Sequence, residues 1–134
     1  MTPQELRTRI KVFEYRCVAI SESLPTDKLS TKVVANQLIC SAFPGASNYR
    51  TTRAQSKPQF LNKLNIALEE VDESLDWLES IRDLNLSSAE NLPDLLDEAE
   101  QLVKILGAAK HTLQLNLNKK NPPKLLTKDR ELND

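Results

Sequence analysis

The stretch Ser56–Leu78, SKPQFLNKLNIALEEVDESLDWL, decides the fold. Ser56 can cap a helix, Pro58 falls in the first turn, where its missing N–H does no harm, and Gln59 stands at the capping-box spacing. Apolar residues then recur every three or four positions, which predicts one helix to about Asp83. The stripe consists of Phe60, Leu64, Ala67 or Leu68, Val71, Leu75, Leu78 and Ile81. Other helices are needed to cover it.

The segment from about Pro3 to Leu24 predicts a first helix. Thr2 can cap it, and Glu5 follows at the capping-box spacing. Its stripe is Leu6, Ile10, Phe13, Cys17, Ile20 and Leu24. Val12, Tyr15 and Val18 widen this apolar arc, as Trp77 widens the arc of the Ser56 helix, which indicates either a thick core or a subunit interface.

A second helix is expected from Thr26 or Asp27 to about Arg50. Its apolar face is Leu29, Val33 or Val34, Leu38, Ala42 and Ala46. Small residues around Ser41 favour a close approach by a neighbouring helix. Pro44-Gly45 lies inside the pattern, so we expect a kink or a break there.

The fourth helix is predicted to begin at Ser87 or Asn91. Its stripe is Leu92, Leu95, Ala99, Leu102, Leu106, Ala109, Leu113 and Leu117. Gly107 lies within it and suggests close helix packing. The periodicity stops after Leu117, and Pro122-Pro123 prevents a helix from continuing. We therefore expect one domain over residues 1–117 and a polar, flexible tail over residues 118–134.

Together these patterns predict an all-α fold, an antiparallel up-down four-helix bundle. The chain has only two glycines in 134 residues and is 40% hydrophobic, which suits helices and cannot supply glycine-rich phosphate loops. No segment approaches the ~20 apolar residues of a membrane span, and the N-terminus lacks a signal-peptide core. We expect a cytoplasmic protein with no membrane contact. Cys17 and Cys40 are interpreted as buried, reduced thiols, with a disulfide or a metal site as the alternatives.

The residues for catalysis are sparse. His111 is the lone histidine, and no Glu-x-x-His pair of a di-metal bundle is present. The acidic face of the Ser56 helix is therefore interpreted as a solvated or interface surface; it consists of Glu69, Glu70, Asp72, Glu73, Asp76 and Glu79. We expect no enzyme activity, no catalytic residue, no metal and no cofactor.

Basic residues gather around the start of the Ser56 helix instead. The candidate nucleic-acid-binding residues are Arg50, Arg53, Lys57 and Lys63, with Tyr49 as a side chain that can stack on a base. The alternative is that these residues only solvate the surface. Lys119, Lys120 and Lys124 form a second basic group, placed in the predicted tail. The net charge of −1 means that any nucleic-acid site must be a local patch.

A set of short motifs runs through the middle of the chain: Gln37-Leu38, Ser41-Ala42, Asn48-Tyr49-Arg50, Arg53 to Lys57, Phe60, Lys63-Leu64, Ile66, Glu70, Asp72-Glu73-Ser74 and Trp77-Leu78. These motifs resemble those of the bacterial four-helix-bundle family, the intervening-sequence proteins of large-subunit ribosomal RNA. The resemblance covers about Glu5 to Leu117. The chain departs from the family at Pro44-Gly45 and has a link before Arg53 that is one residue shorter.

This resemblance implies a homopentameric ring without enzyme activity. The accessory protein of diversity-generating retroelements looks similar in architecture and implies a reverse transcriptase and nucleic acid as partners. The resulting hypothesis is an oligomeric scaffold that contacts RNA, DNA or a nucleic-acid enzyme. The alternative is a protein-binding adaptor with no nucleic-acid role, using the acidic face and the tail.

Overall fold

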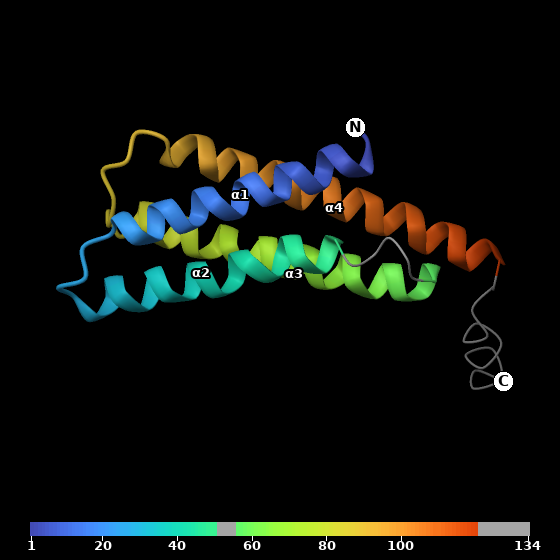
Figure 1. Cartoon of the computed structure of the whole chain (residues 1–134), viewed down its shortest axis with the longest axis horizontal. Helices are drawn as coiled ribbons and strands as arrows, with labels where there is room; N and C mark the ends of the chain where they lie inside the picture. Colours follow the sequence, from blue (N-terminus) through green and yellow to red (C-terminus); the bar gives the residue numbers. More distant parts are fainter. Residues whose placement is uncertain (51–55, 121–134) are drawn as a thin grey trace, which may run out of the picture.

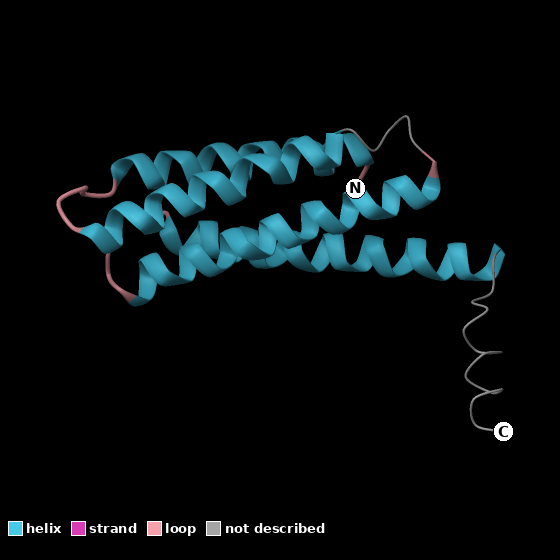
Figure 2. Ribbon diagram, turned by 90° about the horizontal axis from the view of Figure 1, so that it is seen from below, coloured by secondary structure: helices cyan, strands magenta, loops and turns pink. Residues whose placement is uncertain are grey.

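The structure, a computed structural model, describes residues 1–50 and 56–120, without the side chains of 44–50 and 120. Four helices make up the fold: α1 (Pro3–Ser23), α2 (Leu29–Arg50), α3 (Lys57–Asp83) and α4 (Leu92–Lys120). Consecutive helices run in opposite directions, as Figure 1 shows, and Figure 2 shows no strand in the described part of the chain. The predicted all-helical, up-down bundle is confirmed for these residues. No helix among them is both long and apolar enough to cross a lipid bilayer.

The predicted helix starts are formed by side-chain caps. The Thr2 hydroxyl oxygen accepts from the Glu5 N–H at 3.1 Å, and a Glu5 carboxylate oxygen accepts from the Thr2 N–H at 2.7 Å. At the start of α3, the Gln59 side-chain oxygen accepts from the Ser56 N–H at 3.3 Å. These bonds satisfy backbone donors that have no partner inside the helix. The start of α4 follows Asn91, one of the two predicted positions.

The core consists of the inward stripes of all four helices. Its buried members are Leu6, Ile10, Phe13, Cys17, Ile20, Leu24, Val34, Leu38, Ala42, Leu64, Ala67, Val71, Leu78, Ile81, Leu92, Leu95, Leu96, Ala99, Leu102 and Leu106. Most of these residues belong to the predicted stripes, because three-and-four spacing places them on one side of each helix. Removing this apolar surface from water is the main force that holds the bundle together.

Two serines occupy the contact between α2 and α3. The Ser41 and Ser74 hydroxyl oxygens are 3.0 Å apart, and both residues are buried. Ser74 also donates to the Glu70 carbonyl oxygen at 2.9 Å. Small side chains with satisfied hydroxyls allow the two helices to lie close together. This contact agrees with the close approach expected around Ser41.

Of the kink or break expected at Pro44-Gly45, the break is wrong, because α2 continues through both residues to Arg50; the kink stays a prediction. Proline removes one backbone hydrogen bond from a helix. Leu38 and Ala42, in the turns before the proline, are buried in the core. The apolar face of α2 also differs from the prediction. Leu29 is 78% exposed and Val33 is 46% exposed, and Val34 is the buried member of the valine pair.

Two expectations for α4 are also corrected. A side chain at Gly107 would meet no atom within 4 Å, so this glycine does not mark close helix packing. The helix also runs to Lys120, three residues beyond the predicted end of the bundle. Residues 121–134, the rest of the predicted tail, lie outside the described part of the chain.

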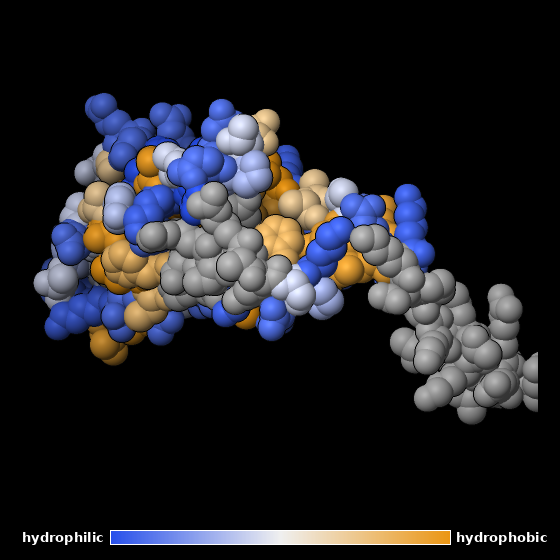
Figure 3. Space-filling view, turned by 45° about the vertical axis from the view of Figure 1, so that its right-hand side comes forward, coloured by the Kyte–Doolittle hydropathy of each residue, from blue (hydrophilic) through white to orange (hydrophobic). Residues whose placement is uncertain are grey.

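Unequal helix lengths give the bundle a narrow end. The helices α1 and α2 have 21 and 22 residues, whereas α3 and α4 have 27 and 29. Arg9 contacts Glu98 and the helices are antiparallel, so α1 begins level with about Lys104 of α4. Figure 1 shows α3 and α4 reaching beyond the shorter pair, and the right-hand end in Figure 3 mixes apolar and hydrophilic side chains. We call this two-helix end the projection; within the described residues it comprises 57–64 and 105–120.

Substitutions at two neighbouring positions of α4 test this packing. Gly107→Ala should raise the free energy of unfolding by up to about 1 kcal/mol, because alanine is the better helix former and open space surrounds the site. Leu106→Ala should lower it by about 2–5 kcal/mol, because Leu106 is fully buried. Urea denaturation measures both. A destabilising Gly107→Ala would contradict the open packing around this residue.

Candidate nucleic-acid interface

The predicted basic residues are divided between described and undescribed parts of the chain. Tyr49 and Arg50 are the last two residues of α2, but their side chains are not described, and Arg53 lies in the undescribed link. Lys57 is the first residue of α3 and is exposed; Lys63 is half-buried. The structure therefore places two of the five candidate side chains, both in the projection.

Lys57 and Lys63 do not share one face of α3. Six residues advance a helix by about 600°, so the two side chains leave the axis about 120° apart. They are separated by about 9 Å along the axis. This spacing suits a broad, positively charged end better than a single pocket that grips one phosphate.

Charge is segregated along α3. Residues 57–68 carry two lysines and no carboxylate, whereas residues 69–83 carry seven carboxylates and one arginine. The pKa of the Glu70 carboxyl is raised above its usual value. Partial burial is the main cause, and the neighbouring charges of Glu73 and Glu69 add a smaller effect. The first half of α3 is therefore basic and the second half is acidic.

The same segregation recurs in α4 with the opposite order. Residues 92–101 carry four carboxylates and neither lysine nor arginine. Residues 102–119 carry Lys104, Lys110 and Lys119 and no carboxylate. Because α3 and α4 are antiparallel, their basic halves lie at the same end of the molecule (Figure 1). Lys104 and Lys110 were missed by the sequence analysis, and Lys119 belongs to the last turn of α4, not to a tail. The order of charges along α4 was the signal that pointed to them.

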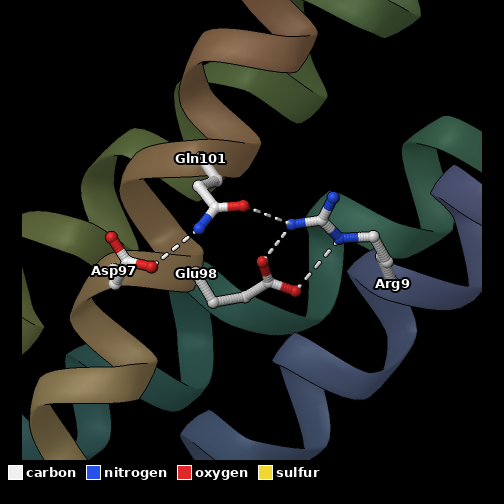
Figure 4. A network of polar contacts seen from close by, with 4 residues as sticks. All are labelled: Arg9, Asp97, Glu98 and Gln101. Atoms are coloured by element: carbon white, nitrogen blue, oxygen red, sulfur yellow. Dashed lines mark hydrogen bonds and ion pairs between the residues drawn. The ribbon is translucent and has the colours of Figure 1, made fainter. Parts of the chain in front are cut away.

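A polar network connects α1 to α4 near the first residues of α1, as Figure 4 shows. The Arg9 guanidinium donates to both carboxylate oxygens of Glu98, with a distance of 3.2 Å from Nε, and to the Gln101 side-chain oxygen at 3.2 Å. Gln101 in turn donates to Asp97 at 2.7 Å. This network links the first turns of α1 to the acidic half of α4 and neutralises part of its charge.

The groups for metal or nucleophilic chemistry are dispersed. Among the described residues, no three His, Cys, Asp or Glu side chains gather as metal ligands would. Both cysteines are free, but only Cys17 is buried as predicted, and Cys40 is exposed on α2. Burial raises the pKa of Cys17 to about 12, which keeps this thiol protonated and unreactive at neutral pH.

The fold is shared with a protein of known structure. A solved protein of unknown function from Bacteroides thetaiotaomicron, belonging to the S23 ribosomal protein family, superposes with a TM-score of 0.72 at 26% sequence identity. The similarity covers 83% of this chain and 99% of that protein. No protein-family model matches the sequence, and no curated protein does. This chain is thus a four-helix bundle similar to a member of a ribosomal protein family, which supports the expected resemblance in its broad form.

The two thiols should differ in reactivity. At pH 8 the native protein should react with a chromophoric disulfide reagent at Cys40 promptly, and at Cys17 only after unfolding, because a buried protonated thiol is a poor nucleophile. A Cys40→Ser variant provides the control and should show no prompt reaction. Rapid labelling of that variant in the native state would contradict the placement of Cys17 in the core.

Proposed function

We propose that this protein is a non-enzymatic, oligomeric scaffold that contacts nucleic acid through its basic end. The observation that carries the proposal is the segregation of charge in α3 and α4, whose lysine-bearing halves share the projection. The predicted residue Arg50 ends α2, and Arg53 follows it three residues later in the sequence, outside the described residues. Together with Lys57 and Lys63 they provide cations for a phosphate backbone, and Tyr49 provides a ring for stacking.

Segregated charge favours orientation as well as affinity. The whole chain is nearly neutral, with a net charge of −1, so a distant polyanion is not strongly attracted to it. Close to the surface, the acidic halves of α3 and α4 repel phosphates and the projection attracts them. A nucleic acid is therefore expected to approach one end of the bundle and to avoid the other.

Exposed apolar residues on the shorter helices support an oligomer. Val12 and Tyr15 of α1 are 50% and 55% exposed, and Phe43 of α2 is 45% exposed. Single exposed apolar side chains are common on any surface, whereas a contiguous patch of them is typical of a subunit interface; Val12 and Tyr15, three residues apart on α1, lie on the same side of that helix. A homopentameric ring, as the family resemblance implies, would present five basic ends together. Weak phosphate contacts would then add by avidity.

The likeness to intervening-sequence proteins and to the accessory protein of diversity-generating retroelements extends the proposal to partners. In this view the ring holds RNA or DNA beside a nucleic-acid enzyme such as a reverse transcriptase. The solved S23-family structure supports the fold of this proposal; its own function is unknown. The non-enzymatic part rests on the single histidine, His111, and on the lack of a Glu-x-x-His pair in the sequence.

A second candidate function is a protein-binding adaptor with no nucleic-acid role. The exposed carboxylates of α3, such as Asp72, Glu73 and Asp76, favour it because they offer a broad surface to a basic partner. A pull-down with nuclease treatment separates the two functions. A partner that survives nuclease favours the adaptor, and one that is released favours nucleic acid.

Nucleic-acid binding should depend on salt and on the basic end. In titrations with structured RNA and with duplex DNA, Arg50→Ala/Arg53→Ala should weaken binding at low salt. For single-stranded regions it should also reduce the slope of log affinity against log salt by about 1.4, since each lost contact is worth about 0.7. Lys57→Glu/Lys63→Glu should weaken binding more than Arg50→Ala/Arg53→Ala does, because it reverses two charges instead of removing them. Lys32→Glu, at an exposed position near the opposite end of the bundle, provides the matched control and should have little effect. No binding by the wild type at low salt would refute the proposal.

The assembly is tested separately by size-exclusion chromatography with light scattering. We expect a single species with five times the 15.1 kDa mass of the chain at micromolar concentration. Tyr15→Glu should shift it toward smaller species, because it places a charge on an exposed apolar surface of α1. A monomeric wild type would contradict the ring.

A further inference from the structure

A groove lies between α3 and α4 in the projection. Neither Lys57 nor Lys63, the two candidate nucleic-acid-binding side chains that the structure describes, lines it. It has a volume of about 410 Å³, within the range of small-ligand sites of about 300–1,000 Å³. Leu61 lines it from α3, and His111, Gln114, Leu115, Leu117 and Asn118 line it from α4. The groove therefore combines three apolar side chains with one imidazole and two amides.

The polar lining follows the helical repeat of α4. His111, Gln114 and Asn118 are separated by three and four residues, which places them along one side of the helix. All three are exposed, so their hydrogen-bonding groups are accessible from the groove. An amide offers donors and acceptors together, and so does a neutral imidazole. Such a row suits the edge of a flat, heteroaromatic ligand.

The apolar lining exists because the bundle narrows at this point. Leu61 and Leu117 are half-buried and Leu115 is 49% exposed. Neither the start of α1 nor the end of α2 reaches this far along the long helices (Figure 1). The apolar stripe of α4 continues beyond the ends of α1 and α2, which help to cover the rest of it. Orange and blue side chains accordingly lie next to each other at this end of Figure 3.

Lysines flank the groove on α4. Lys104 lies seven residues before His111 and therefore on the same side of the helix, and Lys119 lies one turn after Leu115. Both are exposed and are about 22 Å apart along the axis. Residues 102–119 contain no carboxylate. Within the described part of α4, the charge beside the groove is thus complementary to a polyanion, and the carboxylates of α3 begin only at Glu69, about 12 Å along the axis from Leu61.

We propose that this groove receives unpaired nucleobases of a single-stranded nucleic acid, with Lys104 and Lys119 holding the flanking phosphates. The inference rests on the proposed function and deepens it by naming the class of nucleic acid. Leu61, Leu115 and Leu117 contact the apolar faces of a base, and His111, Gln114 and Asn118 bind its hydrogen-bonding edge. In a duplex these faces are stacked and these edges are paired, so only unpaired nucleotides can enter.

The test compares single-stranded RNA, single-stranded DNA and a duplex of equal length at low salt. The wild type should bind at least one single strand about tenfold more tightly than the duplex. Gln114→Leu/Asn118→Leu removes the amides without changing charge and should abolish this preference through weaker single-strand binding. Asn36→Leu, an exposed amide replaced on α2, is the matched control and should keep the preference. Circular dichroism checks that each variant retains its helices.

The outcomes separate this inference from the proposed function. If only the groove variant loses the single-strand preference and the control keeps it, the result supports binding of unpaired bases in the groove. An unchanged preference in that variant, or equal binding of single strands and duplex by the wild type, overturns the groove while leaving a nucleic-acid scaffold intact. Failure of the wild type to bind any of the three probes overturns both. Lys104→Gln/Lys119→Gln should weaken the binding of both single-stranded probes. Unchanged binding would overturn the proposed role of these two lysines.

Discussion

Burial of four apolar stripes against one another is the interaction on which the structure depends. Most of the stability of these helices comes from the covered part of their stripes. Three of the four helices supply fully buried leucines, such as Leu38, Leu64, Leu78 and Leu102. The stripes are unequal in length. At one end of the bundle the stripes of α1 and α2 stop short, and α3 and α4 continue as a pair. Leu113 and Leu117 of α4 are therefore only half-buried. The narrow end is a direct consequence of this mismatch.

Charge then gives the narrow end its character. A helix pair of uniform composition would offer the same surface along its whole length. Here the lysines of α3 precede its carboxylates, and the lysines of α4 follow its carboxylates. Antiparallel packing brings the two basic halves together and the two acidic halves together. The fold thereby converts two linear charge patterns into a molecule with oppositely charged ends, and this polarity is the basis of the proposed function.

Local signals in the sequence predict much of the fold. Thr2 and Ser56 mark helix starts because capping depends on residues three positions apart, and the leucine stripes follow from the helical repeat. Signals that depend on neighbouring helices were less informative. Pro44 suggested a kink or a break, yet α2 continues through it to Arg50. Gly107 suggested close packing, yet open space surrounds it. Of the candidate site, Lys57 and Lys63 were found from sequence, but the groove from Leu61 to Asn118 required the register of α3 against α4.

The most direct test of this charge-based account is a lysine acetylation footprint of the wild-type protein, read by mass spectrometry with and without single-stranded RNA. The account predicts that RNA protects Lys57, Lys63, Lys104 and Lys119, at the projection and its base, and leaves Lys28 and Lys32 near the opposite end unchanged. Equal protection at both ends would contradict the account, as would protection confined to Lys28 and Lys32.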